Sequence, residues 1–123
     1  MHSVRIDRIN RLVEQRVSGT FDAATVERSG AEMRRAIRSL DAGPGGHLSL
    51  YDLSELTIPS DAVVEGAFQQ LADPRFTYVR ARKVAVVAPS ALMRLKLAGP
   101  AAARDNMAVF AERPDAMRWL FAS

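Results

Sequence analysis

Hydroxyl and carboxylate side chains recur where an expected strand ends and an expected helix begins. One group extends from the end of the strand-like segment 47–53 to the start of the helical segment 60–71. Another such residue follows the apolar run 84–88. In open α/β sheets, ligands bind at the carboxyl ends of strands, and the free N–H groups of a helix start favour anions. We interpret this region as a partner-docking or phosphate-sensitive site. Its candidate residues are Asp52, Ser54, Ser60, Asp61 and Ser90.

A simpler interpretation competes with this one. Serine is a preferred helix N-cap, so Ser60 and Ser90 are also explained as residues that only accept a backbone N–H bond. Glu112 occupies a similar position before the last expected helix, and Asp52 is explained as a partner of nearby backbone. The sequence leaves both interpretations open.

Groups that support catalysis or metal binding are scarce. The chain has no cysteine and two histidines, His2 and His47, and a metal site needs clustered ligands. A catalytic triad would need His47 beside a nucleophile in a cleft. The glycines of the segment 43–46 run from a helix to a strand, which is the wrong direction for a phosphate-binding loop. We expect no enzyme activity, no metal and no cofactor.

Composition and charge narrow the class of partner. The net charge of +3 is only mildly basic. The segment 75–83 mixes basic residues with Phe76 and Tyr78, which could stack on RNA bases, but it lacks the glycine pattern of an RNA-recognition motif. This mixture of residues is explained more simply by a solvated strand edge whose charged side chains prevent aggregation. We expect no nucleic-acid partner.

The apolar segments are too short to insert stably into a membrane. The longest strongly apolar run, 84–88, is far below the roughly 20 residues of a membrane-spanning helix. The first eight residues alternate charged and apolar side chains and lack the apolar core of a signal peptide. We therefore expect a cytoplasmic protein, which agrees with the absence of cysteine.

The periodicity predicts one α/β domain over residues 1–123. Two alternating runs around 4–6 and 13–17 form an antiparallel hairpin, and strands at 47–53, 84–88 and 107–111 alternate with helices. Two helices are expected at 22–40 and 60–71. A third begins at Ser90 and stops at Gly99-Pro100, and a fourth begins near Pro114. Alternating strands and helices predict a mainly parallel sheet of about five strands with about four helices and right-handed crossovers.

Two stretches of sequence, with this order of elements, resemble the STAS superfamily, in particular its SpoIIAA-like branch. The first stretch is Asp52-Leu53-Ser54-Glu55-Leu56-Thr57-Ile58-Pro59-Ser60-Asp61. It resembles the Asp-Leu-Ser opening of anti-anti-sigma factors, which is followed by an Asp-Ser-Ser-Gly segment with a phosphorylated serine. The second is residues 110–120, which are similar to the "F…(D/E)…A…WL" ending of SpoIIAA-like proteins. The apolar strand at 83–88 resembles their middle strand.

The resemblance implies a phosphorylation switch, but this sequence departs from the pattern. When the two Asp-Leu-Ser openings are aligned, Ser60 falls on the conserved acid, Asp61 on the phosphorylated serine and Val63 on the glycine. Asp61 could then imitate a permanently phosphorylated state, although a carboxylate carries less charge than a phosphate. A shift of one residue would instead place Ser60 at the switch.

The function that follows is a non-enzymatic module that binds a protein partner through the loop and helix start after the Asp52 strand. The alternative is a carrier of a lipid or other apolar small molecule, since SpoIIAA-like domains are compared with CRAL-TRIO-like carriers. In that case the segment 92–103 could act as a lid, and an internal apolar cavity of roughly a few hundred Å³ or more would be needed. Homodimer formation is left open.

Overall fold

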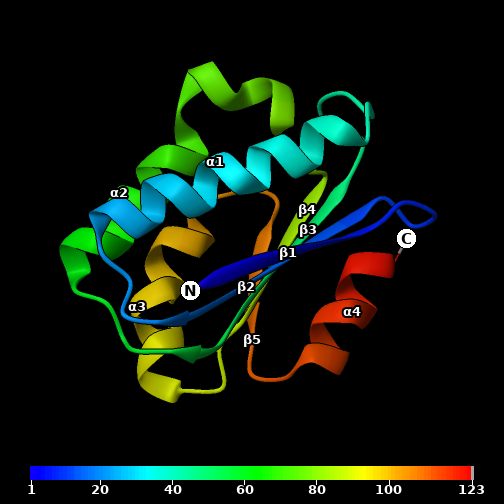
Figure 1. Cartoon of the computed structure of the whole chain (residues 1–123). Helices are drawn as coiled ribbons and strands as arrows, with labels where there is room; N and C mark the ends of the chain where they lie inside the picture. Colours follow the sequence, from blue (N-terminus) through cyan, green and yellow to red (C-terminus); the bar gives the residue numbers. More distant parts are fainter. Residues whose placement is uncertain (123) are drawn as a thin grey trace.

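Five strands form one mixed sheet in the order β1-β2-β3-β4-β5 (Figure 1). The computed structural model describes residues 1–122. β1 pairs antiparallel with β2, and every later pair of neighbours is parallel. The strands are β1 (His2–Asp7), β2 (Leu12–Gly19), β3 (Leu48–Leu56), β4 (Lys83–Val87) and β5 (Met107–Phe110). This architecture confirms the predicted fold class.

The helices are distributed unequally over the two faces of the sheet. Each new parallel strand is added on the same side of the one before it, so right-handed crossovers place their helices on one face. The final helix follows β5 and folds back onto the opposite face (Figure 1). The crossover helices are α1 (Ala23–Ser39), α2 (Asp61–Ala72) and α3 (Ala91–Ala102), with the short 3₁₀ helix η1 (Pro74–Val79) after α2, and the final helix is α4 (Arg113–Phe121).

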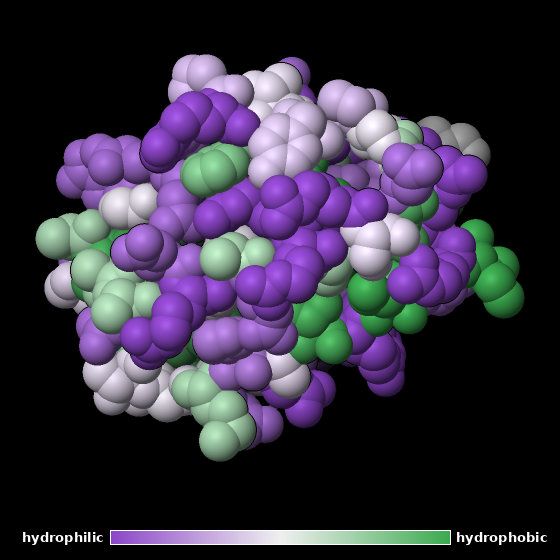
Figure 2. Space-filling model, turned by 45° about the horizontal axis from the view of Figure 1, so that its top comes forward, coloured by the Kyte–Doolittle hydropathy of each residue, from purple (hydrophilic) through white to green (hydrophobic). Residues whose placement is uncertain are grey.

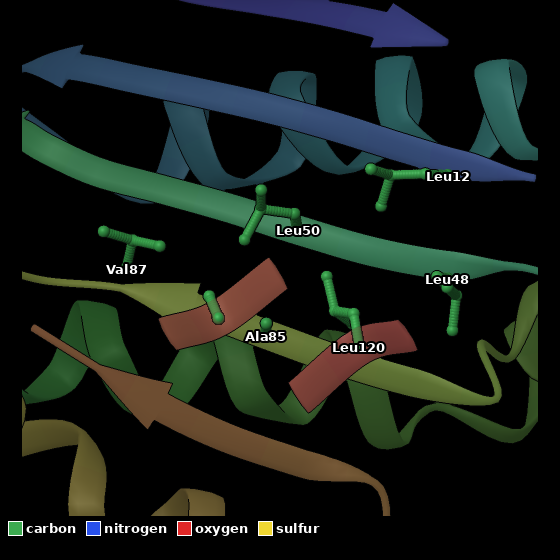
Figure 3. Packing of buried hydrophobic residues seen from close by; sticks show 7 residues of the cluster. Leu12, Leu48, Leu50, Ala85, Val87 and Leu120 are labelled. Atoms are coloured by element: carbon green, nitrogen blue, oxygen red, sulfur yellow. The ribbon is translucent and has the colours of Figure 1, made fainter. Parts of the chain in front are cut away.

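The α4 face holds one of the hydrophobic clusters. Leucines of β2 and β3 pack there with Leu120, whose exposed fraction is 0% (Figure 3). The buried members of the cluster are Leu12, Leu48, Leu50, Ala85, Val87, Ala116 and Leu120, with Phe110, Met117 and Trp119 packed against it. Trp119 is partly buried and packs against this cluster, with its ring 5.7 Å from that of Phe110.

The other face is covered by α1, α2 and α3. Val13, Gln15 and Val17 lie on it, and the alternating pattern of β2 predicts this shared side. The buried apolar residues of α1 are Val26, Met33 and Ile37, which its periodicity places on one stripe, and Thr25 and Ser29 are buried beside them. Figure 2 shows one outer face of the molecule, on which apolar side chains appear in separate groups among polar ones.

Two expectations about local structure were wrong. The pair Gly99-Pro100 does not end the third helix, because α3 continues through both residues to Ala102. The ring of proline fixes φ near the helical value, so Pro100 costs α3 an internal hydrogen bond but is compatible with its final turn. Residues 75–79 also form no strand edge. They belong to η1, whose aromatic rings are held by arginines of α1, with Arg34 3.9 Å from the centre of the Phe76 ring.

No helix in the described part of the chain is long and apolar enough to span a membrane. Residues 1–122 also contain no group of three or more histidine, cysteine, aspartate or glutamate side chains placed to hold a metal ion.

Candidate functional site

The structure separates the five predicted site residues into two groups on opposite faces of the sheet. Asp52 lies on the α4 face, beside Arg16 of β2. Ser60 and Asp61 form the start of α2 on the other face, and Ser90 forms the start of α3. Within the described residues, no hydrogen bond or ion pair joins the two groups.

Asp52 is buried, and its carboxylate organises the end of β3. Its Oδ1 accepts hydrogen bonds from the Ser54 backbone N–H at 2.9 Å and from the Ser54 hydroxyl at 2.5 Å. Arg16 approaches the other oxygen at 3.4 Å. The register of β2 against β3 shifts at this point, so one extra residue bulges out of β3. These contacts support a structural role for Asp52 and Ser54 at the bulge.

The carboxylate of Glu14 continues the charged cluster on this face. Arg113 of α4 donates to Glu14 Oε1 at 2.7 Å, and Arg5 lies 3.7 Å from the same oxygen. Glu14 is largely buried, whereas Arg5 and Arg113 remain in contact with solvent. The cluster ties the start of α4 to β2, and no local pattern indicates this contact because Glu14 and Arg113 are 99 residues apart.

Ser60 and Ser90 both act as N-caps. The Ser60 hydroxyl accepts the backbone N–H of Val63 at 3.3 Å, and the Ser90 hydroxyl accepts that of Met93 at 3.2 Å. Glu112 stands at the N-cap position of α4, but its side chain makes no capping bond. The capping interpretation is therefore correct for the two serines. Both serines are nevertheless exposed, so capping does not exclude a second role.

Asp61 is joined to α3 by an ion pair. Lys96 Nζ lies 2.8 Å from Asp61 Oδ1 and also donates to the Pro59 carbonyl at 3.1 Å. The hydrogen bond from Lys96 lowers the pKa of the Asp61 carboxyl, with a smaller contribution from its charge. Asp61 itself is 93% exposed, so it remains charged and available at the surface. Sequence reasoning missed Lys96, since no local pattern connects residues 35 positions apart.

An open groove begins at this ion pair and runs between α2 and α3. Val64 and Phe68 line it from α2, and Pro100 and Arg104 line it from the end of α3 and the residues after it. Next to the ion pair, α3 exposes two leucines, Leu92 at 53% and Leu95 at 73%. The loop before α2 adds Ile58, which is 37% exposed. Exposed apolar side chains that are grouped together and rimmed by polar residues mark an interaction surface.

The arrangement of strands and helices is found in solved proteins. A protein of the DUF3478 family from Shewanella loihica PV-4, described as uncharacterised with a SpoIIAA-like fold, is 15% identical with a TM-score of 0.69, over 97% of this chain and 93% of that one. This chain has a SpoIIAA-like fold. No family model matches the sequence, and no curated protein matches it.

Other structures with the SpoIIAA-like fold are anti-sigma factor antagonists. SpoIIAA in its unphosphorylated form is 17% identical, with a TM-score of 0.58 over 95% of each chain. An anti-sigma factor antagonist from Mycobacterium paratuberculosis is 16% identical, with a TM-score of 0.58 over 99% of this chain and 96% of the other. At this level of identity the similarity is one of fold.

Proposed function

We propose that this SpoIIAA-like chain is a non-enzymatic protein-interaction module that binds its partner through the start of α2 and the outer side of α3. We call this region the α2–α3 surface. Its residues are Ile58, Ser60, Asp61, Leu92, Leu95 and Lys96. The observation that carries the proposal is the pair of exposed leucines beside the Asp61–Lys96 ion pair. Solvent exposure of two neighbouring leucines on one helix is explained when a partner covers them.

The structural neighbours support the choice of a protein partner. Two of them are named anti-sigma factor antagonists, and one further structure is SpoIIAA in its phosphorylated form. In the present chain, both candidate switch positions lie at the exposed start of α2. Asp61 supplies a negative charge there, while a phosphate on Ser60 would lie at the free N–H groups of the helix and near Lys96. Either group would set the charge of the α2–α3 surface.

Leu95→Glu tests this surface. We expect the variant to lose at least about 30-fold in partner binding, because the substitution removes an apolar contact and places an unpaired charge in the buried interface, which costs about 2 kcal/mol or more. Stability should change by less than about 0.5 kcal/mol, since Leu95 is 73% exposed and glutamate favours helices. The measurement is affinity purification from the native host with quantitative mass spectrometry, comparing wild type and variant.

The matched control is Ile9→Glu, which introduces the same charge at a residue that is 94% exposed in the turn between β1 and β2. Proteins that bind the α2–α3 surface should be lost from the material purified with Leu95→Glu and should still be recovered with Ile9→Glu. A set of partners that both variants retain in full would contradict the proposal. Asp61→Asn removes the charge of the side chain but keeps its shape, and this variant should bind the same partners more weakly.

The alternative, a carrier of a lipid or other apolar molecule, depends on the size of the cavity in the core. A cavity of about 170 Å³ lies between the sheet, α1 and α2. This volume is below the roughly 300 Å³ at which pockets for drug-sized ligands begin, so it does not suit a lipid chain. The helix α3 is also not a separate lid, because Met93, Leu97 and Ala101 are buried. The cavity suits a much smaller molecule.

A further inference from the structure

The cavity between the sheet and α1 and α2 has mainly apolar walls. Strand residues such as Val17 and Val86 form its floor, and Met33, Ala67 and Leu71 form its sides. Apolar cavities of about 150 Å³ in other proteins bind benzene or xenon, so about 170 Å³ accommodates a single aromatic ring with one small substituent. Ring size and cavity size therefore agree.

Few polar groups line this cavity. Gln15 lines the cavity, and its Nε2 donates a hydrogen bond of 3.0 Å to the Ser29 carbonyl. Tyr51 extends from β3, and burial raises the pKa of its hydroxyl to about 12, with Arg34 and Arg104 acting in the opposite direction. The hydroxyl thus stays protonated at neutral pH and can donate a hydrogen bond.

Arg34 is the one charged residue among those that line the cavity. Its guanidinium lies 3.9 Å from the centre of the Phe76 ring, and its Nη1 donates to Gln70 Oε1 at 3.3 Å. Phe76 and Val79 of η1 also line the cavity, and no residue of η1 is fully buried. A cation held at the edge of an apolar cavity favours a ligand with a negative charge at one end.

We propose that this cavity binds a small aromatic carboxylate, with the ring between the sheet, α1 and α2 and the carboxylate at Arg34 and the Tyr51 hydroxyl. Benzoate has the required size and charge. Toluene has the ring without the charge, and benzylamine has a ring of the same size with the opposite charge. The site is distinct from the α2–α3 surface and does not depend on the function proposed for that surface.

Titrations with these three probes, followed by backbone amide NMR shifts, test the site. We expect saturable shifts at Val17, Gly30 and Ala67, with benzoate binding at least about 10-fold more tightly than benzylamine. Arg34→Gln should abolish the difference between benzoate and benzylamine while toluene binding is retained. Tyr51→Phe should lower the affinity for benzoate several-fold and leave the affinity for toluene unchanged, because only a hydroxyl is removed.

A variant that fills the cavity separates binding inside it from binding at the surface. Ala67→Leu should abolish binding of all three probes, and Ala67→Met, whose flexible side chain adapts to irregular space, serves if the leucine variant does not fold. Ala62→Leu is the matched control, since Ala62 is exposed on the same helix and does not line the cavity. Unchanged benzoate binding in the folded filled variant, or an absence of saturable shifts with any probe, would overturn the proposal. Equal affinity of wild type for benzoate and benzylamine would overturn the assignment of the carboxylate.

Discussion

Leu120→Ala is expected to lower the free energy of unfolding by about 3 to 4 kcal/mol, within the range measured for leucine-to-alanine changes in other cores. Leu120 has an exposed fraction of 0% and packs on Leu48 and Leu50 of β3 from the α4 side (Figure 3). Three helices cover the other face of the sheet, whereas among the described elements α4 alone covers this one. Neighbouring helices cannot close the space, so most of the cavity left by the removed side chain should persist.

Urea denaturation of the variant and of Phe121→Ala checks this expectation. Phe121 is the next residue of α4 and is 44% exposed, so its truncation should cost less than half as much. A similar loss in both variants would mean that the burial of Leu120 against the sheet does not set the cost. A loss below about 1 kcal/mol for Leu120→Ala would mean that α4 contributes little to the stability of the sheet.

Acidification from pH 7 to pH 4 is expected to remove about 3 kcal/mol of stability through His47. The side chain is 2% exposed, its Nε2 lies 3.0 Å from the Ser49 hydroxyl, and its buried Nδ1 has no hydrogen-bond partner among the described residues. Burial lowers the pKa of His47 from 6.5 to about 4. Between these two values the unfolded chain binds a proton that the folded chain does not, so the free energy of unfolding falls as the pH falls.

The pH window identifies the group responsible. Hydrogen bonds lower the pKa values of the carboxyls of Asp7, Asp22, Asp61 and Asp73 below their usual 3.8. What these carboxylates contribute to stability is present above that pH and is lost only as the pH falls below it. A loss of stability between pH 6.5 and pH 4 therefore reports on histidine.

His47→Gln tests this assignment, since glutamine can still hydrogen bond to Ser49 but does not titrate. Urea denaturation at pH 7 and at pH 5 should show a loss of about 2 kcal/mol in wild type and a much smaller loss in the variant. The same two measurements on His2→Gln separate any contribution of the other histidine from that of His47. If His47→Gln keeps the full dependence, the buried imidazole is not its source.

Much of the fold was predictable because the evidence for it is local. The alternation of β2 separates Val13 and Val17 from Glu14, and the doubly apolar run at 84–88 indicates a strand covered on both faces. The caps at Asp22, Ser60 and Ser90 were recognisable because a side-chain oxygen and the N–H it accepts are three residues apart. Two local inferences failed. Pro100 fits a final helical turn, and η1 is stabilised by arginines of α1 that lie far away in the sequence.

The sequence by itself determined the order of strands and helices, the burial of each face and the positions of the caps, because these depend on residues within one or two turns of each other. Only the tertiary structure decided that the strands follow one another in a single direction across the sheet. That order places α1, α2 and α3 together on one face, brings Lys96 to Asp61 across 35 residues and forms the cavity beside Tyr51. It also turns Asp52 away from Asp61. Contacts of this kind depend on strand order and on packing between distant segments, and no local pattern in the sequence records either.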